Sequence, residues 1–120
     1  MKRVVILLSC LFLCVGCSST SSTDGLISYT SAKEKIINNN AILIDVRTTE
    51  EYDENHISGA KLLTLDTISE ETASSIIDSY DTEIIVYCRS GARSSEAKIK
   101  LEELGYKNVY DLGPIDNWKE

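Results

Sequence analysis

Basic residues are scarce in this 120-residue sequence. It has 12 Lys and Arg residues against 19 Asp and Glu residues, which gives a net charge of −7. A protein that coats nucleic acid needs a basic stripe to neutralise phosphates, so we expect no nucleic-acid partner. Hydrophobic residues make up 42% and charged residues 26% of the chain, which is typical of a globular domain and too apolar for a disordered one.

The sequence also lacks an apolar run long enough to cross a membrane. Its longest run, residues 4–15, reads VVILLSCLFLCV, whereas a spanning helix needs about 20 apolar residues. The run follows the basic start Met1-Lys2-Arg3 and has the length of the apolar part of a signal peptide. We therefore interpret residues 1–16 as a targeting segment that lies outside the fold.

The end of this run resembles the lipobox of bacterial lipoproteins. Gly16 precedes Cys17, and the polar stretch 18–25, SSTSSTDG, follows. The resemblance implies cleavage before Cys17 and attachment of a diacylglycerol lipid, such as one carrying palmitate, to its thiol. Residues 17–25 would then be a flexible tether. More than one acyl chain gives stable membrane anchoring. Together with the targeting segment, this predicts an extracytoplasmic location on the cell membrane or an outer membrane.

Other interpretations of the N-terminus stay open. Cys14 stands where lipoproteins usually have Leu, and Leu7-Leu8-Ser9-Cys10 also fits the lipobox spelling. The apolar run before Cys10 has only about five residues, below the 7–15 that are typical, so Cys17 is favoured. An uncleaved anchor and an ordinary secretory signal are the remaining alternatives.

Disulfides and zinc sites are not expected. Cys10 and Cys14 leave with the signal, and Cys17 carries lipid, so Cys88 is the one thiol that remains. His56 is the only histidine, which together with a single thiol cannot complete a zinc site, and we expect no metal.

Short apolar runs alternate with helical patterns over residues 26–120, which we interpret as one domain. Strands are expected at 26–29, 41–44, 60–63, 83–87 and 108–112, the last one broken by Gly113-Pro114. Capping-box patterns at Ser31, Thr48 and Thr67 predict helix starts, and another helix should run from Arg93 to Gly105. After Thr67, an amphipathic face is expected from Ala73, Ile76, Ile77 and Tyr80. The alternation predicts an α/β fold with a central, mainly parallel sheet of about five strands and helices on both faces.

The chemistry-bearing motif is Cys88-Arg89-Ser90-Gly91-Ala92-Arg93-Ser94. An apolar strand brings Cys88 to the carboxyl edge of the sheet, where open α/β sheets bind ligands, and a helix begins a few residues later. Loop N–H groups, the helix N-terminus and two arginines favour a thiolate or another anion on this sulfur. Gly91 permits the backbone angles that such a turn needs. A buried inert cysteine would need neither the glycine turn nor two arginines.

This loop resembles the active-site loop of rhodanese-type sulfurtransferases. Three further segments resemble that family in the same order, and together they cover nearly the whole chain after the tether. The first segment is Leu43 to Arg47, which contains Asp-Val-Arg. The second has two parts, Glu50-Glu51-Tyr52 and His56 to Ala60, and the third is Gly113 to Trp118. The resemblance implies a single rhodanese-like domain.

The resemblance also implies roles for individual residues. Cys88 would be the nucleophile that takes the outer sulfur of thiosulfate or of a persulfide donor and passes it to a thiol or to cyanide. Backbone N–H groups of Arg89, Ser90, Gly91, Ala92 and Arg93 would hold the persulfide anion, and Arg89 would face the mouth. Arg93 is expected to turn inward and pair with Asp45, and we expect Asp45 and Arg47 to brace the loop. The covalent persulfide makes a separate cofactor unnecessary, and we expect a monomer.

The sequence departs from the family pattern at two positions, and other functions stay open. Ser58 stands where the family has Pro, and Pro114 replaces a Gly near the rim, which affects substrate access. We expect His56 in a structural loop, and Trp118 and Tyr87 in packing roles. One alternative is a non-catalytic or low-turnover rhodanese module that carries sulfur or senses redox state for a membrane partner. A remote one is a cysteine phosphatase or arsenate reductase, although Cys88 to Arg93 has four intervening residues where phosphatase loops have five.

Overall fold

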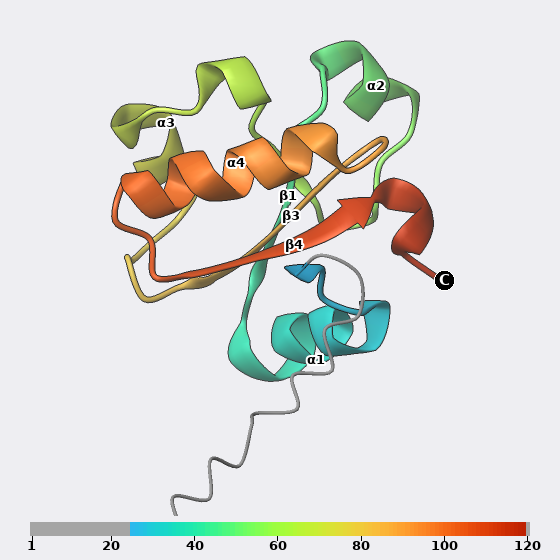
Figure 1. Ribbon diagram of the computed structural model, residues 1–120, viewed down its shortest axis with the longest axis horizontal. Helices are drawn as coiled ribbons and strands as arrows, with labels where there is room; N and C mark the ends of the chain where they lie inside the picture. The colour runs from blue at the N-terminus through green and yellow to red at the C-terminus, as the bar shows by residue number, and fades with distance from the viewer. Residues whose placement is uncertain (1–24, 120) are drawn as a thin grey trace, which may run out of the picture.

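A computed structural model describes residues 25–119 of the chain, whose core is one parallel sheet between helices (Figure 1). The strands are β1 (Ile42–Asp45), β2 (Lys61–Leu62), β3 (Glu83–Cys88) and β4 (Asn108–Pro114). The α-helices are α1 (Tyr29–Asn39), α2 (Thr49–Glu54), α3 (Glu70–Ser74) and α4 (Ala92–Glu103). Two 3₁₀ turns, η2 (Leu65–Thr67) and η3 (Ile115–Asn117), complete it. The predicted α/β class is confirmed.

Both faces of the sheet are covered, as predicted. The sheet order is β2-β1-β3-β4, and every pairing is parallel. Helix α1 packs on one face, and α3 and α4 lie on the other (Figure 1). Successive side chains of a strand point to opposite faces, so Ile84 and Val86 enter one core cluster while Ile85 and Tyr87 enter the other. This double burial explains why β3 reads as a continuous apolar run.

The fifth predicted strand, residues 26–29, is wrong as a strand. Leu26 forms a single parallel bridge to Asp111, and α1 already begins at Tyr29. Ser28 is the N-cap because its side chain accepts a hydrogen bond from the Ser31 backbone N–H, so the capping box predicted at Ser31 is also wrong.

The capping box at Thr48 is confirmed, whereas the one at Thr67 is wrong. Thr48 and Glu51 exchange the two reciprocal hydrogen bonds at the start of α2. Thr67 instead ends η2, where its hydroxyl donates to the Thr64 carbonyl, and the box forms between Ser69 and Thr72.

The amphipathic helix that was expected to follow is cut short. Helix α3 ends at Ser74, so the predicted face is not continuous. Ala73 and Ile77 are still buried, but Tyr80 is 49% exposed and stacks at a tilt on Tyr106.

Strand β4 continues through the expected break at Gly113-Pro114. A register shift between Val86 and Tyr87 lets Gly113 pair with Tyr87 and Pro114 with Cys88. Pro114 is the last residue of an edge strand, where a missing N–H is tolerated. Consequently β4 ends directly beside the residue at which β3 ends.

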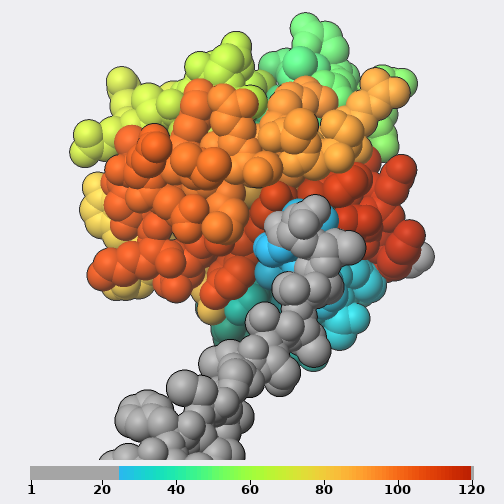
Figure 2. Space-filling view, in the orientation of Figure 1, coloured from blue at the N-terminus to red at the C-terminus, as the bar shows by residue number. Residues whose placement is uncertain are grey.

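The carboxyl ends of β3 and β4 meet the N-terminus of α4 at one corner of the molecule. Figure 2 shows the start of α4 in light orange next to the red C-terminal segment on the visible face. Within residues 25–119, no helix is long and apolar enough to span a bilayer.

Candidate active site

Cys88 is the last residue of β3 and has no solvent exposure. Its sulfur accepts a hydrogen bond from the Gly91 backbone N–H, with an N–Sγ distance of 2.9 Å. A donor molecule must therefore reach the sulfur through the loop that covers it.

Gly91 makes this hydrogen bond possible through its backbone conformation. Its φ of +103° lies in the left-handed region that favours glycine, and it is the N-cap of the 12-residue helix α4. An N-cap glycine has no side chain that could accept hydrogen bonds from the first N–H groups of the helix, and Gly91 makes no side-chain cap. The positive end of the helix dipole lies at this end of α4, which favours an anion.

The other residues of the loop differ in how much they are exposed to solvent. Arg89, Ser90 and Ala92 are exposed, whereas Arg93 is half-buried. Arg89 is exposed, and its place at the mouth of the site stays a prediction.

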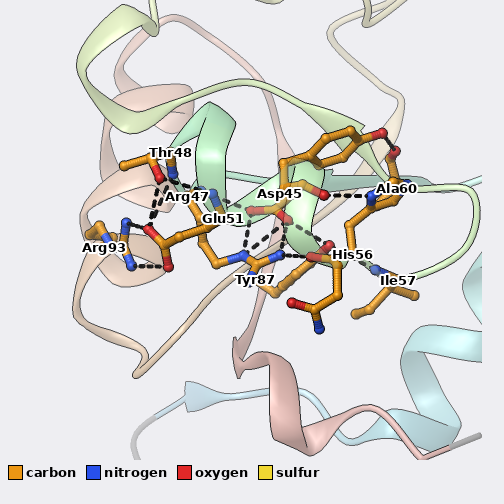
Figure 3. Close-up of polar contacts among 11 residues, drawn as sticks. Asp45, Arg47, Thr48, Glu51, His56, Ile57, Ala60, Tyr87 and Arg93 are labelled. Carbon is orange, nitrogen blue, oxygen red and sulfur yellow. Dashed lines mark hydrogen bonds and ion pairs between the residues drawn. The ribbon is translucent and has the colours of Figure 1, made fainter.

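Arg93 does not pair with Asp45, so that prediction is wrong. Its guanidinium forms two hydrogen bonds to Glu51 of α2, at 2.7 and 3.1 Å (Figure 3). Asp45 has no oxygen to offer, because Arg47 and Tyr87 already occupy its carboxylate. The hydrogen bonds from Arg93 lower the pKa of Glu51 to about 2.

Asp45 and Arg47 form a buried network at the end of β1, with exposures of 0% and 4%. Arg47 Nη2 donates to Asp45 at 2.7 Å and to the Asn55 carbonyl at 2.6 Å. The Tyr87 hydroxyl donates to Asp45 at 2.8 Å and accepts from the Ile57 N–H at 3.1 Å (Figure 3). The hydrogen bond to Asp45 raises the pKa of Arg47, and burial raises the pKa of Tyr87 far above its ordinary value.

This network ties segment 55–57 to the ends of two strands. The direct hydrogen bonds of Asp45 and Arg47 therefore go to that segment and to Tyr87, while bracing of loop 89–93 by them stays a prediction. A fully buried ion pair needs such additional hydrogen bonds to offset the loss of hydration.

His56 and Trp118 make packing contacts with other aromatic residues. The His56 ring stacks on Tyr52 with centroids 3.7 Å apart, and its Nδ1 lies 2.8 Å from the Tyr52 carbonyl oxygen. Trp118 packs edge-on against Tyr29 at 4.9 Å. These contacts fit the structural roles expected for His56 and Trp118.

Pro114 closes one side of the site. It pairs in register with Cys88, and a Cβ on Gly91 would lie 3.5 Å from the Pro114 ring. A cleft of about 240 Å³ lies beside Arg93 and is lined by Val46, Arg47, Thr48, Thr64, Leu65, Asp66 and Arg93.

Three residues make contacts at the site that their sequence patterns did not predict. Ser94 is fully buried with its Oγ 3.5 Å from the Cys88 sulfur. Glu51 binds Arg93, and the Tyr87 hydroxyl, not only its ring, joins the buried network. The spacing of Ser94, Ala97 and Leu101 on one helical face was the available signal for Ser94.

A family model for the rhodanese-like domain matches residues 28–120, and the chain belongs to that family. Among curated relatives, the thiosulfate sulfurtransferase PspE of Escherichia coli (strain K12) is 40% identical over 72 residues, which are 60% of this chain and 68% of PspE. The thiosulfate sulfurtransferase GlpE of Coxiella burnetii is 31% identical over 94 residues, which are 78% of this chain and 85% of GlpE. A solved rhodanese with anions from E. coli matches with a TM-score of 0.59 and 32% identity over 64% of this chain and 89% of that one.

Replacing Tyr87 with Phe should lower the free energy of unfolding by about 1–3 kcal/mol, because it leaves the buried Ile57 N–H without an acceptor. Urea denaturation measures the difference. The matched control Tyr110→Phe removes a hydroxyl outside the network and should change stability by less than about 0.5 kcal/mol. Equal effects of the two substitutions would contradict the account of this network.

The Glu51–Arg93 ion pair should stabilise the protein most at neutral pH. The pKa of Glu51 is lowered from 4.5 to about 2 by folding, so its contribution is complete above about pH 4.5 and is lost as the pH falls towards 2. Glu51→Gln should cost about 1 kcal/mol at pH 7, and the cost should shrink over that acidic range.

The control for this substitution is Glu50→Gln. Both residues are acidic and lie in the first turn of α2, so they interact similarly with the helix dipole. A pH-dependent cost of the same size for Glu50→Gln would show that the effect belongs to the dipole and not to Arg93.

Proposed function

We propose that the protein is a sulfurtransferase that carries a sulfane sulfur as a persulfide on Cys88. The observation that carries this proposal is the Gly91 N–H bound to the Cys88 sulfur, at the junction of a parallel strand and the start of α4. Membership of the rhodanese-like family and two relatives named thiosulfate sulfurtransferases support it.

The proposed first half-reaction is an attack by the Cys88 thiolate on the outer sulfur of thiosulfate. A new S–S bond forms on Cys88, the S–S bond to the sulfonate sulfur breaks, and sulfite leaves with the electron pair. A persulfide donor would react in the same way, with a thiolate as the leaving group. Exposed Arg89 can attract the anionic end of the donor, and the loop N–H groups hold the persulfide anion.

The second half-reaction passes the terminal sulfur to an acceptor. An acceptor thiolate, or cyanide in an assay, attacks that sulfur, and the Cys88 thiolate leaves. The reaction is therefore covalent and proceeds in two steps, with ping-pong kinetics expected. The acidic net charge of the chain does not oppose an anionic donor, since salt screens distant charges beyond about 8–10 Å.

Treatment with thiosulfate should add the mass of one sulfur atom to the protein, and peptide mapping should place it on Cys88. Cyanide should then remove that sulfur and release thiocyanate. Cys88→Ser should abolish both events, while Ser90→Ala, which changes an exposed loop side chain, should retain them. Intact-mass spectrometry and a thiocyanate assay measure the two steps.

Three outcomes distinguish the alternatives. Sulfur gain with negligible thiocyanate production would favour a sulfur carrier. Turnover of an aryl phosphate without transfer from thiosulfate would favour a phosphatase and contradict the proposal. Sulfur gain that persists in Cys88→Ser would show that another cysteine is responsible.

The N-terminal segment supports a second, independent part of the proposal: export and anchoring through a lipid on Cys17. Residues 1–24 lie outside the described part of the structure, so this interpretation comes from the lipobox-like Gly16-Cys17 and the polar stretch that follows. Anchoring would place the enzyme outside the cytoplasm at a membrane surface, where it would meet its donor and its thiol acceptor.

Expressed in a bacterium that is fed a palmitate analogue, the protein should be labelled and recovered in the membrane fraction. Cys17→Ser should abolish the label, whereas Cys14→Ser should retain it. Label that depends on Cys10 instead would move the lipidation site, and no label in any variant would contradict anchoring by lipid.

A further inference from the structure

Ser94 lies directly beneath the active-site loop and is fully buried. It is in the first turn of α4, and it shares a buried face with Ala97 and Leu101. A hydroxyl on a face that is otherwise apolar costs free energy unless it is hydrogen-bonded. Its partners therefore indicate what the hydroxyl does.

The hydrogen bonds of Ser94 close a ring around the sulfur of Cys88. The thiol donates to Ser94 Oγ at 3.5 Å, and Ser94 Oγ donates to the Gly91 carbonyl at 3.0 Å. The Gly91 N–H completes the ring by donating to the sulfur at 2.9 Å. In this arrangement the thiol hydrogen lies between Cys88 Sγ and Ser94 Oγ.

Loss of that proton leaves the hydroxyl free to reverse its direction. A serine hydroxyl has one hydrogen, which turns about the C–O bond towards the better acceptor. A thiolate is charged and accepts more strongly than the Gly91 carbonyl. The carbonyl would not be left without a partner, because the Ser95 backbone N–H also donates to it at 3.2 Å.

From this geometry we propose that Ser94 is a catalytic residue whose hydroxyl turns from the Gly91 carbonyl to the Cys88 sulfur whenever that sulfur becomes a thiolate. The inference rests on the proposed sulfurtransferase function for its place in the reaction. The thiol proton goes to bulk water, and the hydroxyl hydrogen stays on Ser94 throughout. Ser94 therefore stabilises Cys88 as the attacking group in the first half-reaction and as the leaving group in the second.

The test is the pH dependence of Cys88 alkylation by iodoacetamide, followed on the Cys88 peptide so that other cysteines do not interfere. Removing one hydrogen bond to the thiolate should move the midpoint of the profile upward by about one pH unit in Ser94→Ala, which is roughly tenfold slower alkylation below the midpoint. The control Ser95→Ala, an exposed side chain on the next position of the helix, should match the wild type.

The charged groups on the elements next to the site are the same in the variant and in the control. On the elements that surround the site they are Arg89, Arg93 with Glu51, Arg47 with Asp45, and Asp111. A shift that is confined to Ser94 variants therefore reports the hydroxyl. Ser94→Thr, which keeps the hydroxyl, should restore the wild-type midpoint.

The kinetics of thiosulfate turnover provide the second readout. Ser94→Ala should lower kcat and leave the KM for thiosulfate unchanged, since the hydroxyl contacts the sulfur of Cys88 and not the donor. Superimposable alkylation profiles for wild type and Ser94→Ala would overturn the proposal.

Failure of the proposed function is distinguishable from failure of this inference. Alkylation needs no sulfur donor, so a shifted profile without thiosulfate turnover would support the hydroxyl switch and contradict sulfur transfer. An unshifted profile with normal turnover would do the reverse.

Discussion

The site depends on one hydrogen bond, from the Gly91 N–H to the Cys88 sulfur. It requires that the chain reverse within three residues of the end of β3, which the left-handed φ of Gly91 makes possible. It also requires that α4 begin at that point, because Gly91 is the N-cap of the helix. Any side chain at position 91 would strain the backbone and approach Pro114, so this position links the strand, the helix and the edge of β4.

Packing on both faces of the sheet holds this junction in place. On one face, Ala97 and Leu101 of α4 are fully buried against β3, and the same helical face carries Ser94 to the sulfur. On the other, the hydroxyl of Tyr87 joins the Asp45–Arg47 pair to segment 55–57. Neighbouring residues of β3 thus lie on opposite faces: Tyr87 joins the polar network on one face, and Cys88 contacts Ser94 of α4 on the other.

Much of this arrangement was predictable because its signals are local. The apolar run of β3, the glycine within the loop and the face of α4 each follow from a few consecutive residues, and they placed Cys88 at a strand-to-helix turn. The helix starts were less predictable, since a serine or threonine becomes an N-cap only if its oxygen is not otherwise engaged, as that of Thr67 is. The partner of Arg93 depended on where α2 lies in space, so the sequence favoured the wrong carboxylate. Ser94 belonged to the predicted motif but was given no role, because its contact with the sulfur depends on the residue at which α4 starts.

The central claim is that the loop turns its N–H groups and the Ser94 hydroxyl towards a sulfur anion at Cys88. A crystal structure of the protein after reaction with thiosulfate tests this most directly. The account predicts a second sulfur bonded to Cys88 Sγ and enclosed by the loop, within about 3.5 Å of backbone N–H groups of residues 89–93. A persulfide that points away from these groups, or a sulfur bonded at any other residue, would contradict it.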